Sequence, residues 1–139
     1  MLMGKFKHAV DPKNRLIIPS KIKDQLGPVI TMIKDSDHCL CLYSKEEWEK
    51  YTAKLSAQPK TQSKALIRFL YSNAIELQPD AQGRVLIPQD MLDFAGITKN
   101  IITVGCGNYA EIWAEEKWFE EGLDEQPEDF AEMLKELGL

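Results

Sequence analysis

The sequence lacks any apolar run approaching the ~20 residues that a membrane-spanning helix requires. Its first residues contain neither the apolar core nor the cleavage site of a secretory signal peptide. We therefore expect a cytoplasmic protein with no membrane partner. Hydrophobic residues make up 44% and charged residues 28% of the 139 residues, which excludes wholesale disorder and allows a real core.

Cysteine and histidine are scarce. The three cysteines are an odd number, and Cys39 and Cys41 are too close to bridge one another comfortably, so a disulfide framework is excluded and a reducing compartment is favoured. Cys106 stands alone, so no zinc-finger spacing exists, and we expect three buried packing thiols. The only histidines, His8 and His38, lie in no context typical of nucleophilic catalysis, and we expect His8 to be an exposed strand residue. The sequence thus predicts no catalytic residue, metal site, cofactor or small-molecule substrate.

The net charge of −5 is unevenly distributed along the chain. Residues 1–64 contain 12 Lys or Arg against 7 Asp or Glu, whereas residues 65–139 contain 5 against 15. The first part therefore carries +5 and the second −10. Such an asymmetry indicates one basic working surface on an otherwise acidic protein, so the overall charge does not exclude a nucleic-acid partner.

An internal repeat organises the chain. The segment AVDPKNRLIIPSKIKDQLG (9–27) matches QPDAQGRVLIPQDMLDFAG (78–96) at a shift of 69, and a shift of 70 aligns 42–48 with 112–118. Two units of roughly 45 residues result, each too small to be stable alone, so we expect them to share one core. The coinciding pairs are Asp11 and Asp80, Arg15 and Arg84, Pro19 and Pro88, Gly27 and Gly96, Glu46 and Glu116, and Trp48 and Trp118.

Each unit predicts the same order of elements. A short strand leads into a four-residue turn whose first residue, an aspartate, accepts a backbone N–H and whose fourth residue, Asn14 or Gly83, occupies the left-handed region. A buried strand, a short helix between proline and glycine, and a strand pair follow. The ranges are buried strands at 16–18 and 85–87, strand pairs at 29–34 with 38–43 and 100–105 with 109–113, a linker at 56–63, and helices from 44, over 64–71 and after 127.

Basic residues gather around the first turn. An arginine at a fixed place after a hairpin turn, present twice, holds a planar five-donor group that suits phosphate oxygens or the O6 and N7 atoms of guanine. The aspartate four residues earlier either orients this arginine or only pairs with it to staple the hairpin. Six basic residues lie within nineteen positions, opposed only by Asp11: Lys5, Lys7, Lys13, Arg15, Lys21 and Lys23.

Two copies of D-x-x-x-R followed by three hydrophobic residues and proline, each with a later strand pair ending in Leu-Tyr or Ile-Trp, resemble the MraZ family. The similarity covers nearly all of residues 1–121, whereas 122–139 lies beyond it. MraZ proteins belong with the AbrB-type DNA binders, whose swapped-hairpin barrels normally arise from two chains. The resemblance implies an α+β fold in which two tandem AbrB-like repeats of one chain form a pseudo-two-fold, double-split (swapped-hairpin) β-barrel with short flanking helices.

The resemblance also implies a domain organisation. We expect a first AbrB-like repeat at 5–47, a helix, linker and connecting helix at 48–75, a second repeat at 76–119 and an acidic helical extension at 120–139.

The function implied is a sequence-specific, nucleoid-associated transcriptional regulator. It would bind double-stranded DNA at short direct repeats in the promoter of the division and cell-wall gene cluster, as a ring-shaped homo-oligomer. Asn14 replaces the family's usual glycine, and Gln82 stands where a lysine would strengthen phosphate contact, so the second loop carries less charge. The expected DNA-binding residues are Lys5, Lys7, Asp11, Lys13, Asn14, Arg15, Asp80, Gly83 and Arg84.

Two alternatives stay open at this point. A ring-forming protein-interaction scaffold without specific DNA binding would use the acidic face, but it needs no paired arginines on repeated turns. A small metal-dependent enzyme would need ligands that the sequence does not supply at metal-binding spacing.

Overall fold

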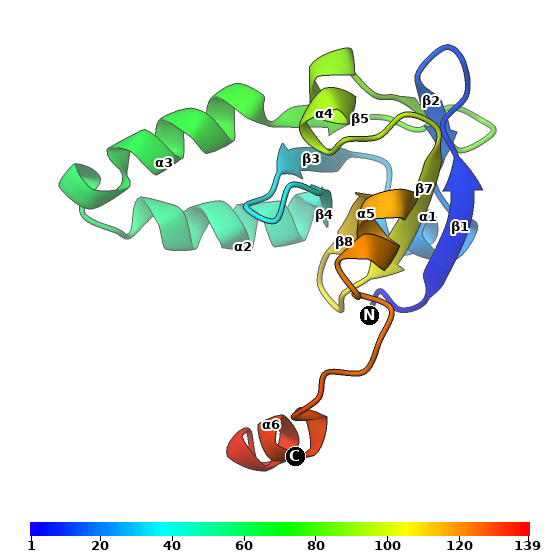
Figure 1. Cartoon of the computed structure of the whole chain (residues 1–139). Helices are drawn as coiled ribbons and strands as arrows, with labels where there is room; N and C mark the ends of the chain where they lie inside the picture. Colours follow the sequence, from blue (N-terminus) through cyan, green and yellow to red (C-terminus); the bar gives the residue numbers. More distant parts are fainter.

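The structure of the chain, a computed structural model, describes residues 1–139. A six-stranded antiparallel sheet and a separate two-stranded ribbon form its body; two long helices project from one side of it, and the C-terminal helix stands apart (Figure 1). The predicted α+β class is confirmed. The strands are β1 (Lys5–Ala9), β2 (Arg15–Ile17), β3 (Ile30–Lys34), β4 (Leu40–Ser44), β5 (Ile75–Leu77), β6 (Arg84–Leu86), β7 (Asn100–Gly105) and β8 (Ala110–Ala114). The helices are α1 (Ser20–Leu26), α2 (Lys45–Ser56), α3 (Lys60–Asn73), α4 (Gln89–Phe94), α5 (Glu115–Glu120) and α6 (Phe130–Glu136).

The strand order joins the two halves of the chain. The sheet runs β1-β7-β8-β4-β3-β5, and the ribbon pairs β2 with β6. β1 pairs with β7 of the second half, and β5 of the second half pairs with β3 of the first. If each strand is replaced by its counterpart in the other half of the chain, the same order is obtained, read from the opposite edge of the sheet. Each half therefore gives its first strand to the other half, and neither completes its sheet alone.

Two hydrophobic clusters form the core. Leu40 and Leu42 of β4 belong to a cluster of 21 buried residues shared with the ribbon, α1 and α4. Cys41 and Tyr43 belong to a second cluster of nine, shared with α2, α3 and α5. Because alternate residues of a strand point to opposite faces, the sheet lies between the two clusters. The ribbon therefore rests on one face of the sheet.

The ribbon corrects one sequence prediction. Strands at 16–18 and 85–87 were expected to be buried, but Ile17 is 54% and Leu86 63% exposed. Leu16 and Val85 point into the larger cluster, whereas the opposite face of this two-stranded ribbon has nothing packed on it.

Three other details differ from the sequence predictions. Pro59 is the N-cap residue of α3, so the expected linker shortens to 57–59 and the connecting helix begins at Lys60. Cys39 and Cys41 are buried as expected, but Cys106 is only partly buried. His8, expected to be an exposed strand residue, is half-buried beside Thr103.

The C-terminal segment stands apart from the body. α6 has no buried residue and follows an extended segment leading away from α5 (Figure 1). Its large apolar side chains, including Phe130, Met133 and Leu137, are exposed. None of the helices is both long and apolar enough to cross a membrane.

Candidate nucleic-acid interface

The first loop joins β1 to β2 and is built around Asp11. Its Oδ1 atom accepts the backbone N–H groups of Lys13 and Arg15, both at 2.9 Å. Its carbonyl oxygen accepts the N–H of Asn14 at 3.0 Å. Asn14 has φ of 61°, so the predicted left-handed position is confirmed. An aspartate side chain that accepts N–H groups two and four residues ahead fixes the path of this loop.

The second loop, between β5 and β6, repeats this geometry. Asp80 Oδ1 accepts the backbone N–H groups of Gln82 and Arg84 at 2.9 and 3.0 Å. Gly83, at the position of Asn14, has φ of 78°. The two loops thus share one backbone conformation despite their different residues.

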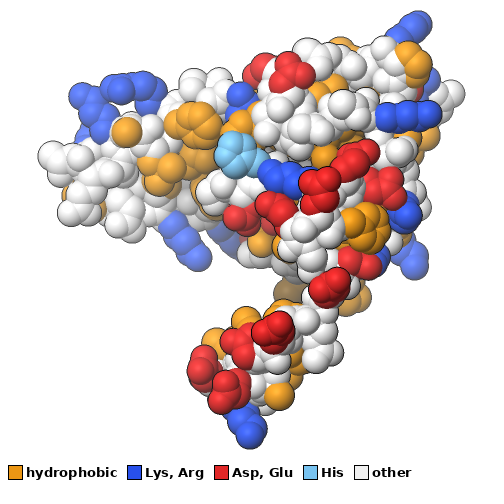
Figure 2. Space-filling model, viewed as in Figure 1, with side chains coloured by type: hydrophobic (Ala, Val, Ile, Leu, Met, Phe, Trp, Pro, Cys, Tyr) orange, Lys and Arg blue, Asp and Glu red, His pale blue; other side chains and the backbone are white.

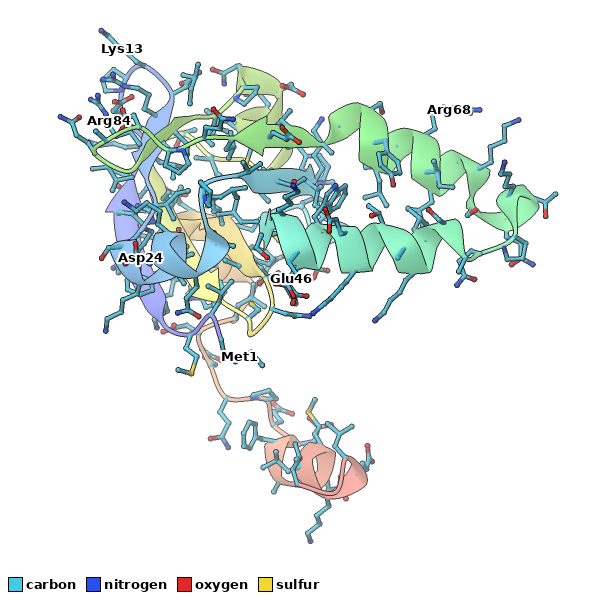
Figure 3. All side chains as sticks on the ribbon, turned by 180° about the vertical axis from the view of Figure 1, so that it is seen from behind. Met1, Lys13, Asp24, Glu46, Arg68 and Arg84 are labelled. Carbon is cyan, nitrogen blue, oxygen red and sulfur yellow. The ribbon has the colours of Figure 1, made fainter.

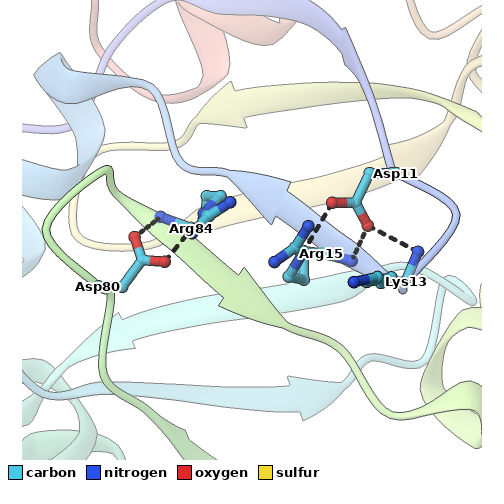
Figure 4. A network of polar contacts seen from close by, with 5 residues as sticks. All are labelled: Asp11, Lys13, Arg15, Asp80 and Arg84. Atoms are coloured by element: carbon cyan, nitrogen blue, oxygen red, sulfur yellow. Dashed lines mark hydrogen bonds and ion pairs between the residues drawn. The ribbon is translucent and has the colours of Figure 1, made fainter.

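Each aspartate also holds its arginine. Arg15 Nε donates to Asp11 Oδ2 at 2.8 Å, and Arg84 Nε donates to Asp80 Oδ2 at 2.9 Å (Figure 4). A guanidinium has five N–H donors, so these bonds leave both terminal NH₂ groups of each arginine available. The aspartates therefore orient the arginines without consuming the groups that bind a bidentate acceptor.

The charge of both aspartates is stabilised locally. The backbone N–H of Arg15, followed by its guanidinium, lowers the pKa of Asp11, against an opposing effect of burial. The backbone N–H and guanidinium of Arg84 lower the pKa of Asp80 in the same way. Both carboxylates are accordingly ionised at neutral pH and remain acceptors for the arginines.

The ribbon brings the two loops together. β2 and β6 pair antiparallel, with Arg15 opposite Leu86 and Ile17 opposite Arg84. Because side chains alternate, these four residues share the outer face of the ribbon. Figure 4 shows Arg15 and Arg84 on this ribbon, between the two loops. We call these four residues the ribbon face.

Hydrogen bonds to the two loop residues with positive φ, Asn14 and Gly83, connect the two halves of the chain. The N–H of Ile18 donates to the carbonyl of Gly83 at 3.0 Å, and the N–H of Ile87 donates to the carbonyl of Asn14 at 2.8 Å. The Asn14 side-chain amide also donates to Gln89 Oε1 at 3.0 Å. Asn14 and Gly83 therefore set the backbone that carries the arginines, and the amide of Asn14 is already engaged.

Two lysines extend the positive charge of this corner. Lys13 projects from the first loop at the same corner of the molecule as Arg84 (Figure 3). Lys23 of α1 lies beside the second loop: a Cβ atom placed on Gly83 would be 3.7 Å from its Nζ atom. Gln82 gives the second loop no positive charge, but Lys23, from the first half of the chain, lies beside this loop and supplies one.

Lys5 and Lys7 lie elsewhere. Both are on β1, where Lys5 pairs with Asp124 and Lys7 pairs with Glu115 at 2.9 Å. Lys7 Nζ also lies 5.6 Å from the centre of the Phe119 ring. Their charges are thus partly neutralised by the acidic segment that follows β8. Figure 2 shows acidic side chains gathered over α5 and α6, and basic side chains both at the corner of the β1–β2 loop and along the α2–α3 hairpin.

Comparison with known proteins identifies the family of this chain. The family described as "MraZ protein, putative antitoxin-like" matches residues 1–68 and 70–136. The chain belongs to the MraZ family. Proteins named "Transcriptional regulator MraZ" from Clostridium tetani and Clostridium acetobutylicum are each 42% identical to it, and one from Acetivibrio thermocellus is 39% identical. These alignments cover 100% of this chain and 100% of each relative.

The sequence-based prediction did not place three residues on this surface: Ile17 and Leu86 were expected to be buried, and Lys23 was counted only among the basic residues around the first turn. The two-residue period of a strand places Ile17 on the side of Arg15 and Leu86 on the side of Arg84, so their exposure could have been read from the alternation. No local signal could have placed Lys23 beside Gly83, because the two residues belong to different repeats and meet only in the folded chain.

Proposed function

We propose that this chain is a non-enzymatic, sequence-specific DNA-binding transcriptional regulator whose ribbon face enters the major groove. The relatives named above are called transcriptional regulators. The observation that carries the proposal is that Arg15 and Arg84, from two separate loops, are held by identical aspartate contacts on one face of a two-stranded ribbon. A two-stranded β-ribbon has the size that the major groove admits.

The arginines supply the base contacts in this proposal. With Nε held by aspartate, the terminal NH₂ groups of Arg15 and Arg84 face outward and can donate to guanine O6 and N7. Their side chains are about one-third exposed, at 34% and 33%. Partial burial and fixed torsions reduce the entropy lost on binding, so the site is preorganised for a bidentate acceptor.

The lysines supply phosphate contacts. Lys13 and Lys23 flank the two loops, and neither makes a salt bridge. Such groups bind the DNA backbone without reading sequence, and they make affinity depend on salt. Lys5 and Lys7 contribute less, because acidic residues already pair with them.

One ribbon alone offers too little discrimination. Each bidentate arginine contributes about 1–3 kcal/mol, whereas useful specificity needs about 4–10 kcal/mol over non-specific DNA. We therefore propose that the chain is a nucleoid-associated protein that acts as a ring-shaped homo-oligomer. It would bind short direct repeats in the promoter of the division and cell-wall gene cluster. Tethered subunits raise the effective concentration of each further contact. α3 offers exposed apolar side chains for subunit contacts at Leu66, Phe69 and Tyr71.

We further propose that the body is a double-split, swapped-hairpin barrel made of two tandem AbrB-like repeats, 5–47 and 76–119. The reversal symmetry of the strand order and the exchange of β1 and β5 between the halves support this assignment. The segments 48–75 and 120–139 would then be a helical hairpin and an acidic extension.

The test is a gel-shift titration with a duplex from the region upstream of the protein's own gene. Arg15→Ala removes one base contact from every subunit, so we expect loss of the specific complex. Lys54→Ala is the matched control, because it removes the same positive charge from α2, away from the ribbon face (Figure 1). The control should bind as the wild type does.

The outcomes separate the two candidate functions. If folded, oligomeric Arg15→Ala protein shifts this duplex as well as wild type, the Asp–Arg pairs are only hairpin staples and the DNA-binding mechanism is wrong. A chain that forms oligomers but shows no preference for its own upstream region would favour a ring-forming protein scaffold, which would bind a protein partner through its acidic face.

A further inference from the structure

A second cluster of reactive side chains lies on the other side of the sheet from the ribbon. Asp35, Cys39, Cys41 and Glu111 each contribute one oxygen or sulfur atom, and these four atoms all lie within 4.8 Å of one another. In the sequence the cysteines show no zinc-finger spacing, because Cys106 stands alone. The structure supplies different partners, because Glu111 comes from the second half of the chain.

Regular structure holds the four residues in place. Cys41 of β4 is the register partner of Glu111 in β8, so their side chains lie side by side on one face of the sheet. A tight turn brings Asp35 beside Cys39: the N–H of Asp35 donates to the Cys39 carbonyl at 3.0 Å, and His38 within the turn has φ of 58°. The cluster is therefore fixed by strand pairing and by one strained turn.

The distances suit a tetrahedral metal site. Cys39 Sγ lies 3.8 Å from Glu111 Oε2 and 4.0 Å from Asp35 Oδ2. In a zinc site with Zn–S of about 2.3 Å and Zn–O of about 2.1 Å, a sulfur and an oxygen ligand are about 3.6 Å apart. Shifts of a few tenths of an ångström would bring these atoms to that separation.

The surroundings favour a cation. Cys39 and Cys41 are 0% and 1% exposed. Neither Asp35 nor Glu111 takes part in a salt bridge, so the four acidic groups share no basic partner. The second oxygen of Glu111, Oε1, accepts the indole N–H of Trp113 at 3.1 Å, which is the kind of contact that orients a metal ligand.

We propose that Asp35, Cys39, Cys41 and Glu111 bind one zinc ion. Two thiolates favour zinc over magnesium or calcium, which prefer oxygen ligands alone. The ion would link β4 to β8, where the two halves of the chain meet in the sheet. A metal at that seam stabilises the folded chain, because the separated strands of the unfolded chain present no such site. A surface hollow lined by Cys106, Glu111 and Trp113 gives access from solvent.

The first experiment uses the full chain, freed of metal with a chelator under reducing conditions. We expect one equivalent of Zn²⁺ to bind, measured by atomic spectroscopy after desalting, and to raise the melting temperature. Co²⁺ in place of Zn²⁺ should give the sulfur-to-metal charge-transfer absorption and visible bands of a tetrahedral thiolate site. Wild-type protein that retains no stoichiometric zinc and gives no thiolate absorption with Co²⁺ would overturn the proposal.

Variants then locate the site. Cys41→Ser and Glu111→Gln should lose stoichiometric zinc, and Trp113→Phe should weaken binding by about 10- to 100-fold as a positioning residue. Cys106→Ser is the matched control, since it removes a thiol outside the four ligands and should retain one zinc. Circular dichroism verifies that each metal-free variant is folded. Folded Cys41→Ser and Glu111→Gln proteins that bind zinc as tightly as wild type would contradict the assignment.

Discussion

Arg15 and Arg84 occupy diagonal corners of the ribbon face. Arg15 lies opposite Leu86 and Arg84 lies opposite Ile17, so each guanidinium has an apolar side chain of the other strand beside it. The face thus alternates hydrogen-bond donors with apolar surface. Guanine presents two acceptors in the major groove, whereas thymine presents a methyl group, so this arrangement can read both bases.

The first prediction concerns Ile17 and Leu86. If they contact thymine methyl groups, replacing the thymines of the bound duplex by deoxyuridine should weaken wild-type binding, because only the methyl groups are lost. The double variant Ile17→Ala/Leu86→Ala should bind both duplexes equally. Since both side chains are more than half exposed, each substitution should change the free energy of unfolding by less than about 0.5 kcal/mol.

Fluorescence anisotropy titrations of the two duplexes provide the measurement. Leu137→Ala, an exposed apolar residue on α6, is the control and should keep the wild-type difference between thymine and deoxyuridine. Equal affinity of wild-type protein for both duplexes would show that the apolar corners do not touch thymine methyl groups.

The second prediction concerns Lys13 and Lys23. As phosphate contacts, Lys13→Gln and Lys23→Gln should each reduce the slope of log K against log salt by about 0.9 per phosphate lost, on specific and unrelated DNA alike. Lys54→Gln on α2 removes the same charge away from the loops (Figure 1) and should leave the slope unchanged. A salt slope of the Lys23→Gln variant equal to that of wild type would show that Lys23 makes no phosphate contact beside the second loop.

The third prediction concerns the contact between Lys5 and Asp124. The ammonium group of Lys5, followed by the indole N–H of Trp118, lowers the pKa of Asp124, so this carboxylate is charged and competes with DNA for Lys5. Asp124→Asn should therefore strengthen binding to unrelated DNA at low salt. Asp129→Asn is the control, because it removes the same charge from a side chain that makes no such contact. A gel-shift series that compares the two variants separates the effect of the Lys5–Asp124 contact from the effect of net charge. Equal effects of both variants would show that the Lys5–Asp124 contact does not affect DNA binding.

The fourth prediction concerns pH and His8. Its ring nitrogen Nε2 lies 2.7 Å from Thr103 Oγ1, and burial lowers the pKa of His8 from 6.5, against a smaller opposing effect of the Ile17 backbone. As pH falls through about 6.5, the unfolded chain takes up this proton before the folded chain does. The contribution of His8 to the free energy of unfolding should therefore decrease as the pH falls from 7.5 to 5.5. Above pH 7.5 this contribution should be constant.

Urea denaturation across this range measures the effect. His8→Gln should remove this part of the pH dependence, whereas His38→Gln leaves His8 in place and should retain it. Identical pH profiles for wild type and His8→Gln would show that the His8 proton is not linked to folding.

The turns were predictable from sequence because their chemistry is local. Asp11 and Asp80 at the first position and Asn14 and Gly83 at the fourth specify one backbone conformation within four or five residues, and the structure confirms it. The start of α2 follows from a similarly short-range signal, because the Ser44 hydroxyl accepts the N–H of Glu47. The repeated D-x-x-x-R motifs resemble the MraZ family, and the family comparison confirms this membership.

Pairing between distant segments was decided by the tertiary structure. The exposure of Ile17 and Leu86 depends on which face of the ribbon meets the core, and the position of Lys23 beside Gly83 depends on α1 of one half packing near the loop of the other. The meeting of Cys41 with Glu111 likewise depends on the register of β4 against β8. Register is set by burying one complete set of alternating side chains, and this requires the whole core. The sequence by itself therefore determined each loop, and only the folded sheet determined what each loop and strand lies beside.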